Sequence, residues 1–542
     1  MRARAFGEML RGAMRARARL VCFARLAALL AAAGAALACG AGEGDLAGVD
    51  PAAFADAAQG AAAPASVIAP LAADAAPARK PNVVLIVADD LGWGDLGSYG
   101  GALATPSIDR LAAEGVRFTD FYASAPVCSP SRAGLLTGRY PLRTGISYIV
   151  FAAEASFRQR LSLLAAKLGT RLGASDFHDS FVAGLPASEI TIAEALRVAG
   201  YATGMVGKWH LGDFSHDRQY LPTRHGFDFF EGLPHSNDEF PVAYWRGEQE
   251  QTPDIGLAQE GITADLTRAA IEFVEANRDR PFFLYFAHKN VHLPLYPAER
   301  FRGASPAGAY GDSVAELDAS VGEIVAALAR LGLRDDTLVL FTSDNGPWFQ
   351  GSAGGLRGRK GMPFEGGVRV PLLASWPGAL PAGRVVGAPA MNIDVFPTLL
   401  ARAGLAAPRD RAIDGRDLWP LLTGAASASP HEALFFFHDK QLDGVRAGAW
   451  KYYRHVNRLC WPLPYDKPGT LPGEQTAGYV HADAKTGRSA NLLDAGPMLY
   501  DLARDPGEAY DVAERRPDEA ARLEALAAAW EAAFVANPRG WR

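Results

Sequence analysis

The residues whose types and spacing most clearly suggest a reaction form the string Cys128-Ser129-Pro130-Ser131-Arg132, which continues into Leu136-Thr137-Gly138-Arg139. A cysteine near an arginine could be a thiolate nucleophile, because a nearby positive charge lowers the pKa of a thiol. A lone cysteine is more often a buried structural residue. Neither interpretation accounts for the whole string, so Cys128 needs a third explanation.

Two acidic pairs each follow a predicted strand. Asp89-Asp90 comes after the aliphatic run 83–87, and Asp344-Asn345 comes shortly after the run 338–341. One such pair alone is most often a helix cap or a turn. Two pairs at strand ends offer only oxygen ligands, which suit a hard divalent cation such as Ca²⁺ or Mg²⁺.

Three further segments carry cationic and imidazole side chains that could take part in chemistry. Lys208 and His210 stand two residues apart, and this spacing lets both project the same way from an extended segment. His292 follows a strand-like run and could serve as a general acid, since the pKa of histidine lies near neutrality. Lys360 stands in a basic loop. Taken alone, each of these residues would be read as a surface or structural side chain.

The Cys-x-Pro-x-Arg string with its Leu-Thr-Gly-Arg extension resembles the signature of the type I, formylglycine-dependent sulfatase family. The arylsulfatase and N-acetylgalactosamine-6-sulfatase branch is the most similar. In that family a formylglycine-generating enzyme oxidises the cysteine to formylglycine (3-oxoalanine), whose hydrated aldehyde is the nucleophile. The resemblance covers Asn82 to the C-terminus. It implies that Cys128 is modified, that Arg132 holds it, and that the fold is alkaline phosphatase-like.

The resemblance also assigns roles to the other residues. The ligands it implies for one Ca²⁺ or Mg²⁺ ion are an oxygen of modified Cys128 and those of Asp89, Asp90, Asp344 and Asn345. The residues it places against sulfate are Lys208, Ser236, His292 and Lys360. His210 would contact a hydroxyl of the nucleophile. The match at Ser236 is looser, and this serine could equally be a turn residue.

These roles describe hydrolysis of a sulfate monoester of a small molecule or glycan. Hydrated formylglycine attacks sulfur, with Asp344 as a candidate activator, while the lysines, His292 and the cation neutralise the sulfate oxygens. His292 or Lys360 protonates the departing alcohol. His210 then takes the proton from the second hydroxyl, which expels sulfate.

Two rival functions stay open. One is a phosphate or phosphonate ester hydrolase of the same superfamily, although the second acidic cluster of those enzymes tends to read Asp-His rather than Asp344-Asn345. The other is a non-catalytic glycan-binding relative, which would not need every catalytic position to be filled. Both lie within the same fold, so fold alone does not separate them.

The elements that must position these residues follow from hydrophobic patterning. The runs 83–87 and 338–341 are typical of central strands covered on both faces, and residues 314–331 repeat apolar side chains at helical spacing. Alternating strands and helices predict an α/β fold with a large mixed, mostly parallel sheet sandwiched by helices. Ligands bind beyond the carboxyl ends of such strands, so the two acidic pairs are expected to be neighbours.

The C-terminal part has a different texture. Shorter strand-like runs at 433–437 and 449–453 precede a helix rich in Ala and Glu at 514–535. We therefore expect a catalytic domain over 81–430 and a smaller α+β subdomain over 431–542. Residues 147–187 read as an insertion of helical character that shapes the leaving-group pocket, and Glu365 and Arg369 as a buried pair that supports the loop of Lys360.

The N-terminal region and the cysteines bear on localisation. Residues 1–39 combine arginines, a short apolar core and small residues before Cys39, which is typical of a secretory signal, or of a bacterial lipoprotein signal with the lipid on Cys39. Residues 40–80 are rich in Ala, Gly and Pro and are expected to be a flexible linker. The protein would then be exported: periplasmic, anchored to the outer membrane, or secreted. A disulfide between Cys128 and Cys460 would consume the nucleophile. The net charge of −6 does not point to a nucleic-acid partner.

Overall fold

The computed structural model of the chain describes residues 49, 52–55, 64–72, 80–152, 180–454, 456, 481–482, 489–490 and 497–542. The predicted signal 1–39 with Cys39, residues 153–179 of the predicted insertion, and Cys460 lie outside the described residues. In the described part of the chain, no helix combines the length and the apolar character that crossing a membrane requires.

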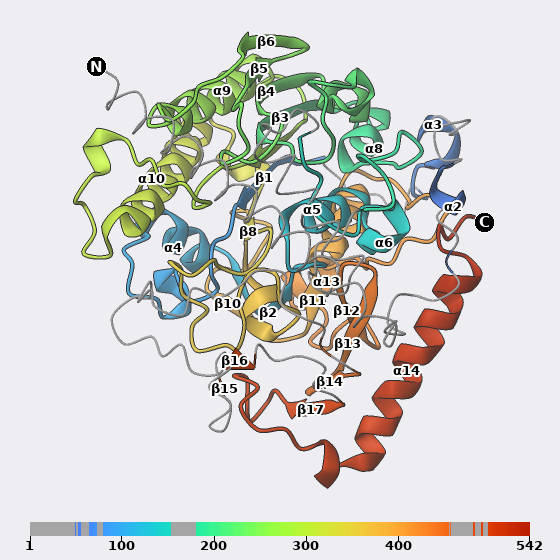
Figure 1. Cartoon of the computed structure of the whole chain (residues 1–542). Helices are drawn as coiled ribbons and strands as arrows, with labels where there is room; N and C mark the ends of the chain where they lie inside the picture. The colour runs from blue at the N-terminus through green and yellow to red at the C-terminus, as the bar shows by residue number, and fades with distance from the viewer. Residues whose placement is uncertain are drawn as a thin grey trace, which may run out of the picture.

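A large sheet runs through the protein (Figure 1), with the strand order β10-β2-β9-β8-β1-β7-β3-β4-β5-β6 and with β11 paired to β2. Its strands are β1 Asn82–Ala88, β2 Val116–Tyr122, β3 Ala202–Lys208, β4 Phe229–Leu233, β5 Tyr244–Arg246, β6 Gln249–Thr252, β7 Phe282–Ala287, β8 Thr337–Ser343, β9 Arg369–Ser375, β10 Arg384–Val386 and β11 Ala390–Met391. The neighbours β8, β1, β7, β3 and β4 are parallel, whereas β9 and β5 join them antiparallel. The prediction of a mixed, mostly parallel sheet is confirmed.

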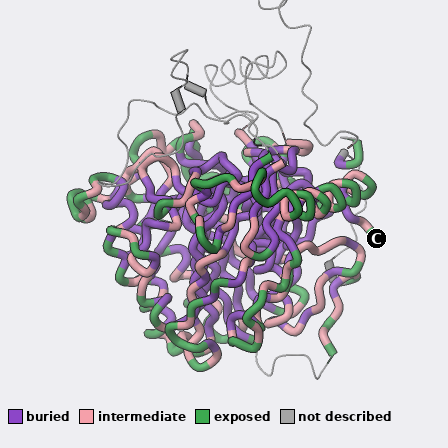
Figure 2. The backbone as a smooth tube through the Cα atoms, turned by 90° about the horizontal axis from the view of Figure 1, so that it is seen from below, coloured by how far each residue is buried: buried purple, intermediate pink, exposed green. Residues whose placement is uncertain are grey.

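Helices cover both faces of this sheet. The helices on one face are α4 Pro106–Ala113, α9 Ile262–Ala276 and α10 Gly308–Arg330, and those on the other are α5 Cys128–Thr137, α8 Ile192–Val198 and α12 Val395–Arg402. Side chains alternate along β1, so that Val83 and Leu85 enter one core while Val84 and Ile86 enter the other. Because both faces are buried, the strand has no polar face. Figure 2 shows buried backbone throughout the interior and exposed segments at the periphery.

The C-terminal part adds a second, antiparallel sheet of order β12-β13-β14-β17. Its strands are β12 Leu434–His438, β13 Gln441–Ala447, β14 Trp450–Tyr453 and β17 Met498–Asp501, and β15 His481–Ala482 pairs separately with β16 Ser489–Ala490. The long helix α14, Pro517–Ala536, packs against β13 and β14 and forms one edge of the molecule (Figure 1). The rings of Tyr122 in β2 and Phe436 in β12 meet at 5.3 Å, which joins the two sheets.

Part of the predicted linker 40–80 is packed against the body. The short helices α2 Ala52–Ala55 and α3 Pro64–Val67 lie in it. Phe54 is 1% exposed and stacks on Phe181 at 4.5 Å, and the Leu71 amide donates to the Gly404 carbonyl at 2.8 Å. The linker prediction is wrong for these pieces, because one buried aromatic ring and a few backbone hydrogen bonds anchor a segment that is otherwise poor in apolar residues.

Candidate active site

Five neighbouring parallel strands end at the same edge of the sheet and deliver most of the predicted site residues. Asp344 follows β8, Asp89 follows β1, His292 follows β7, Lys208 ends β3, and Ser236 follows β4. The register pairs Ala88 with Ser343, so the residues that come next are side by side. The expected adjacency of the two acidic pairs is therefore confirmed, and its cause is the parallel pairing of β1 with β8.

Cys128 is the first residue of α5, and its side chain enters the same cluster. It is 1% exposed, and its Sγ lies 3.4 Å from Asp89 Oδ1 and 3.6 Å from Lys208 Nζ. Burial raises the pKa of this thiol well above its usual value, although Lys208 and Lys360 act to lower it. Cys128 is a free cysteine. Its environment does not favour a thiolate, so the simplest reading of a Cys-Arg string, a thiolate nucleophile, is not supported.

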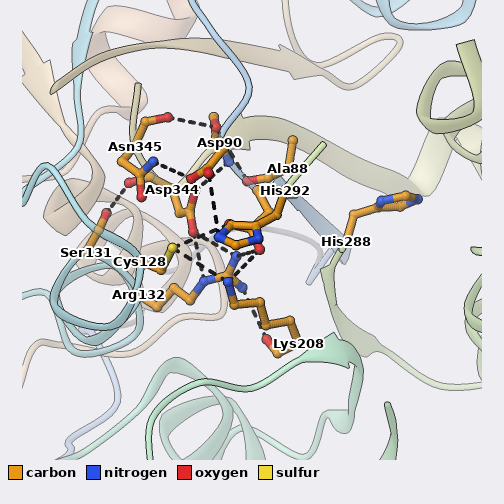
Figure 3. A network of polar contacts seen from close by, with 12 residues as sticks. Ala88, Asp90, Cys128, Ser131, Arg132, Lys208, His288, His292, Asp344 and Asn345 are labelled. Atoms are coloured by element: carbon orange, nitrogen blue, oxygen red, sulfur yellow. Dashed lines mark hydrogen bonds and ion pairs between the residues drawn. The ribbon is translucent and has the colours of Figure 1, made fainter. Parts of the chain in front are cut away.

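The acidic residues are held by cations and by one another (Figure 3). Arg132 donates to Asp344 Oδ2 through Nε at 3.0 Å and Nη2 at 2.8 Å. Lys208 Nζ donates to Asp89 Oδ2 at 2.6 Å, and Lys360 Nζ donates to Asp90 Oδ2 at 2.8 Å. Burial acts to raise the pKa of Asp89, but Lys208, His292 and Arg132 outweigh it and hold that pKa well below its usual value. Burial and the neighbouring Asp89 raise the pKa of Asp344.

The donor set fits a hard divalent cation. The Asp90 amide donates to Asp344 Oδ1 at 3.2 Å, and Asn345 Nδ2 donates to Asp90 Oδ1 at 2.8 Å, so Asp90, Asp344 and Asn345 lie together. Asn345 Oδ1 is buried and has no hydrogen-bond partner among the described residues. Oxygens of Asp89 and Asp90 also lie within 4.8 Å of Cys128 Sγ and a ring nitrogen of His292. A buried amide oxygen without a donor, beside three carboxylates, is what a bound Ca²⁺ or Mg²⁺ would satisfy.

Two of the side chains that the resemblance places against sulfate, Lys208 and His292, meet at Ser236. Its Oγ accepts a hydrogen bond from Lys208 Nζ at 3.2 Å and lies 3.2 Å from His292 Nδ1. His292 Nε2 lies 3.6 Å from Asp90 Oδ2, where Lys360 also binds. His288 points away from this group in Figure 3, and its Nδ1 accepts from the Asn290 amide at 2.9 Å. Ser236 therefore links the lysine to the histidine.

The backbone that carries His210 differs from the extended segment expected for it. The strand ends at Lys208, and His210 has a left-handed backbone with φ 57°, so the two side chains do not share one extended segment. Its Nε2 lies 3.0 Å from Glu239 Oε1. Sequence reasoning missed Glu239, although it stands three residues after Ser236 in an acidic pair with Asp238.

A cavity of about 440 Å³ opens above the cluster. Its polar lining is made by Asp90, Cys128, His210, Ser236, Asp238, Glu239, His292 and Lys360, and its apolar lining by Ile149, Phe151, Leu293 and Trp348. Ile149 and Phe151 belong to the start of the predicted insertion 147–187. The described beginning of that segment therefore forms part of the pocket wall.

Comparison with known proteins identifies the family. Residues 81–405 match the family model named Sulfatase, and residues 429–536 match the model for the C-terminal region of aryl-sulfatase. The chain belongs to the sulfatase family. Mouse steryl-sulfatase is 38% identical over 85% of the chain and 83% of its own length, and human arylsulfatase A is 39% identical over 83% and 87%. Canine N-acetylgalactosamine-6-sulfatase is 36% identical over 80% of the chain and 81% of its own length.

The fold of this sulfatase also matches a solved sulfatase structure. PsFucS1 from Pseudoalteromonas sp. superposes with a TM-score of 0.68 at 27% identity, over 84% of the chain and 91% of that structure. These likenesses confirm the resemblance of the Cys128 string and the predicted fold class. The protein is therefore an enzyme that hydrolyses sulfate esters, in a family that uses formylglycine and a divalent metal.

The loop of Lys360 is supported as expected. Arg369 Nη1 lies 3.2 Å from Glu365 Oε2, and Lys451 of β14 lies 2.7 Å from Glu365 Oε1. All three side chains are at least nine-tenths buried. The C-terminal sheet of the sulfatase thus braces the segment that carries Lys360, through a contact that sequence patterning did not predict.

Proposed function

We propose that this sulfatase hydrolyses sulfate esters with formylglycine made from Cys128 and one bound divalent cation. The observation that carries the proposal is the position of Cys128 Sγ, which lies 3.4 Å from Asp89 and 3.6 Å from Lys208 at the floor of the cavity. A side chain at that point can contact both a cation held by the carboxylates and a sulfate held by the lysine. When hydrated, formylglycine supplies one hydroxyl that attacks sulfur and a second whose deprotonation releases sulfate.

The residues proposed to hold the cation are Asp89, Asp90, Asp344 and Asn345. The cation would orient the nucleophile and neutralise charge on a sulfate oxygen. We favour Ca²⁺, with Mg²⁺ as the alternative, because a cage built from four protein side chains suits Ca²⁺, whereas Mg²⁺ usually keeps several waters. Arg132 fixes Asp344 through two N–H groups and so keeps one side of the cage in place.

The chain's own residues supply the remaining steps. Lys208 and Lys360 neutralise the sulfate oxygens, and the Ser236 hydroxyl holds the Lys208 ammonium in position. His292 or Lys360, which both line the cavity, protonates the departing alcohol oxygen. His210 accepts a proton during release of sulfate. The apolar walls exclude water from the charged floor and strengthen these interactions.

The pocket walls support an apolar leaving group. Phe151 and Trp348 present rings, and Ile149 and Leu293 present aliphatic surface, around the polar floor. Such a lining favours the sulfate ester of a phenol or another ring alcohol over a sulfated glycan with many hydroxyls. The names of the relatives arylsulfatase A and steryl-sulfatase agree with this preference.

The proposal is tested by measuring hydrolysis of an aryl sulfate, the matching aryl phosphate and sulfated monosaccharides under the same conditions. We expect the highest kcat/KM for the aryl sulfate. Faster cleavage of the phosphate would favour the rival phosphoester hydrolase, and faster cleavage of a sugar sulfate would contradict the assigned substrate class. No turnover of any of them, by protein shown to carry formylglycine, would overturn the proposal.

We further propose that maturation needs a formylglycine-generating enzyme and that residues 1–39 direct export, with a lipid on Cys39 as one form of anchoring. Production with and without the generating enzyme tests the first part, because activity should rise with the fraction of Cys128 converted. Cell fractionation of the full chain and of its Cys39→Ala variant tests the second. Full chain recovered only from the cytoplasm would contradict export.

A further inference from the structure

One turn after β4 contacts both functional residues at the end of β3. The turn runs from Ser236 to Glu239 and is closed by a hydrogen bond from the Glu239 amide to the Ser236 carbonyl at 3.1 Å. Its first residue accepts a hydrogen bond from Lys208 Nζ at 3.2 Å. Its last residue places Oε1 3.0 Å from His210 Nε2. The turn therefore supports the lysine at one end and the histidine at the other.

The Glu239 carboxylate is itself fixed. Its Oε2 accepts a hydrogen bond from the Ala152 amide at 3.0 Å, and its side chain is 14% exposed. Burial acts to raise the pKa of Glu239, but the contact with His210 and the charge of His235 outweigh it and lower that pKa to about 2. The carboxylate is thus ionised and has no hydrogen to donate. A lone pair on His210 Nε2 would face this negative charge at 3.0 Å, so the contact favours the tautomer that carries hydrogen on Nε2.

The second ring nitrogen of His210 keeps its lone pair. Both ring nitrogens are buried, and among the described residues neither makes a well-aligned hydrogen bond; Nε2 is the nitrogen that lies 3.0 Å from Glu239 Oε1, and His210 lines the cavity that also contains Cys128. Burial and the charge of Lys208 lower the pKa of His210 to about 3, so the ring is neutral before the reaction. A neutral imidazole with one nitrogen fixed as a donor is ready to accept a proton on the other.

A second pair of residues lies beside the first. His235 Nε2 is 3.3 Å from Asp213 Oδ1, and the rings of His235 and His210 meet edge to face at 6.2 Å. The charged or titratable groups that act on His210 and Glu239 are therefore Lys208, His235 and, through His235, Asp213. Of the two carboxylates in this cluster, Glu239 and Asp213, Glu239 is the one that lies within hydrogen-bonding distance of His210.

We propose that Glu239 is a positioning residue that holds His210 as the Nε2–H tautomer and so leaves Nδ1 to accept the proton that is lost when sulfate is released. The inference rests on the proposed function. In the step it serves, the proton of the second hydroxyl of hydrated formylglycine moves to Nδ1, the carbon–oxygen bond to sulfate breaks with its electron pair on sulfate, and the aldehyde forms again. The hydrogen bond from the Ala152 amide connects Glu239 to the described start of the segment 147–187, which lines the pocket.

The kinetic test compares Glu239→Ala, Glu239→Gln and, as a matched control, Glu272→Ala on α9, a surface glutamate that pairs with Arg268. Loss of a residue that orients a ligand or base typically costs about 10–100-fold in activity, and we expect that loss in kcat for Glu239→Ala. Because sulfate release would become limiting, KM should fall too, and aryl sulfate should give a burst of phenol equal to the formylglycine content. Glu239→Gln should retain more activity, since its amide oxygen can still accept from Nε2–H, and Glu272→Ala should match the unaltered enzyme. An unchanged kcat in Glu239→Ala, or a loss of kcat without a burst, would overturn the proposal.

A spectroscopic test separates this inference from the proposed function. Protein labelled with ¹⁵N-histidine reports which nitrogen of each ring carries hydrogen, and the His210 signals are assigned by their absence in His210→Gln. We expect a single Nε2–H form in the unaltered protein and a mixture of tautomers in Glu239→Ala. The same tautomer in both would overturn the positioning role. A change of tautomer in a protein that hydrolyses no sulfate ester would instead overturn the proposed function and leave the positioning role intact.

Discussion

Arg132 Nε and Nη2 both donate to Asp344 Oδ2, at 3.0 and 2.8 Å, and neither side chain is exposed. The pair joins α5, which carries Cys128, to the end of β8, which carries two proposed metal ligands. It leaves Asp344 Oδ1 directed to the Asp90 amide. Cys128 and the proposed cation ligands are thus held in one relative position by a buried ion pair.

Arg132→Ala is expected to lower both stability and activity. Removing one partner of a buried ion pair leaves the other charge uncompensated, which costs about 3–5 kcal/mol. The free energy of unfolding from denaturant titration measures this loss. Arg110→Ala, which breaks an exposed pair with Glu114, should change it by less than about 1 kcal/mol. Equal effects of the two substitutions would show that the Arg132 pair does not organise the site.

Removal of the cation should abolish turnover and lower the temperature of unfolding. Without it, the buried carboxylates of Asp89, Asp90 and Asp344 lose a shared positive partner, and ligand binding stabilises the folded state by mass action. Calorimetry before and after chelation, with Ca²⁺ or Mg²⁺ added back, measures the shift. Asn345→Ala should weaken cation binding, while Asn277→Ala, at the end of α9, should not. If chelation changed neither the unfolding temperature nor the turnover, the proposed metal site would be contradicted.

The contacts of Glu365 with Arg369 and Lys451, which brace the segment that carries Lys360, predict that the free energy of unfolding falls at low pH. Burial acts to raise the pKa of Glu365, but Lys451 and Arg369 outweigh it and lower that pKa to about 2. A carboxyl whose pKa is depressed on folding contributes stability above its unfolded pKa, near 4.3, and loses that contribution as pH falls towards about 2. Glu365→Gln should therefore flatten the fall in unfolding free energy between these pH values. An identical pH profile in the variant would contradict the brace.

The apolar pocket walls predict separate effects on different substrates. Phe151→Ala and Trp348→Ala should lower kcat/KM for an aryl sulfate by roughly tenfold, because loss of a ring contact costs about 0.5–1.5 kcal/mol beyond its buried area. The same variants should cleave a sugar sulfate nearly as well as the unaltered enzyme. Tyr510→Ala removes a ring that is 75% exposed outside the cavity lining and serves as the control. Equal losses for both substrates would indicate a general role of these rings in folding.

The parts of the site that lie at strand ends could be predicted from the sequence. One residue separates Asp89 from the apolar run 83–87, and two residues separate Asp344 from the run 338–341; parallel pairing of such runs brings their ends together whatever lies between them. The family resemblance assigns Lys208 and Lys360 to the site, and the structure brings both to the acidic cluster. Hydrophobic patterning and short motifs are therefore enough to predict which of these residues lie at the site.

The remaining contacts depend on turns and on packing between distant segments. Glu239 meets His210 because a four-residue turn folds back over the end of β3, and no periodicity encodes that approach. The spacing of Lys208 and His210 predicts one extended segment, but His210 has a left-handed backbone and lies outside the strand. Phe54 packs against Phe181, which is far from it in sequence, so composition alone placed it in a linker.

Conversion of Cys128 to the formylglycine nucleophile is tested most directly by mass spectrometry of the peptide that contains Cys128, measured on the same samples as aryl sulfate turnover. We predict that the peptide carries formylglycine in place of cysteine and that turnover is proportional to the converted fraction across preparations. Cys128→Ala should fold and show no turnover. Full activity in protein whose Cys128 is entirely an unmodified thiol would contradict the account.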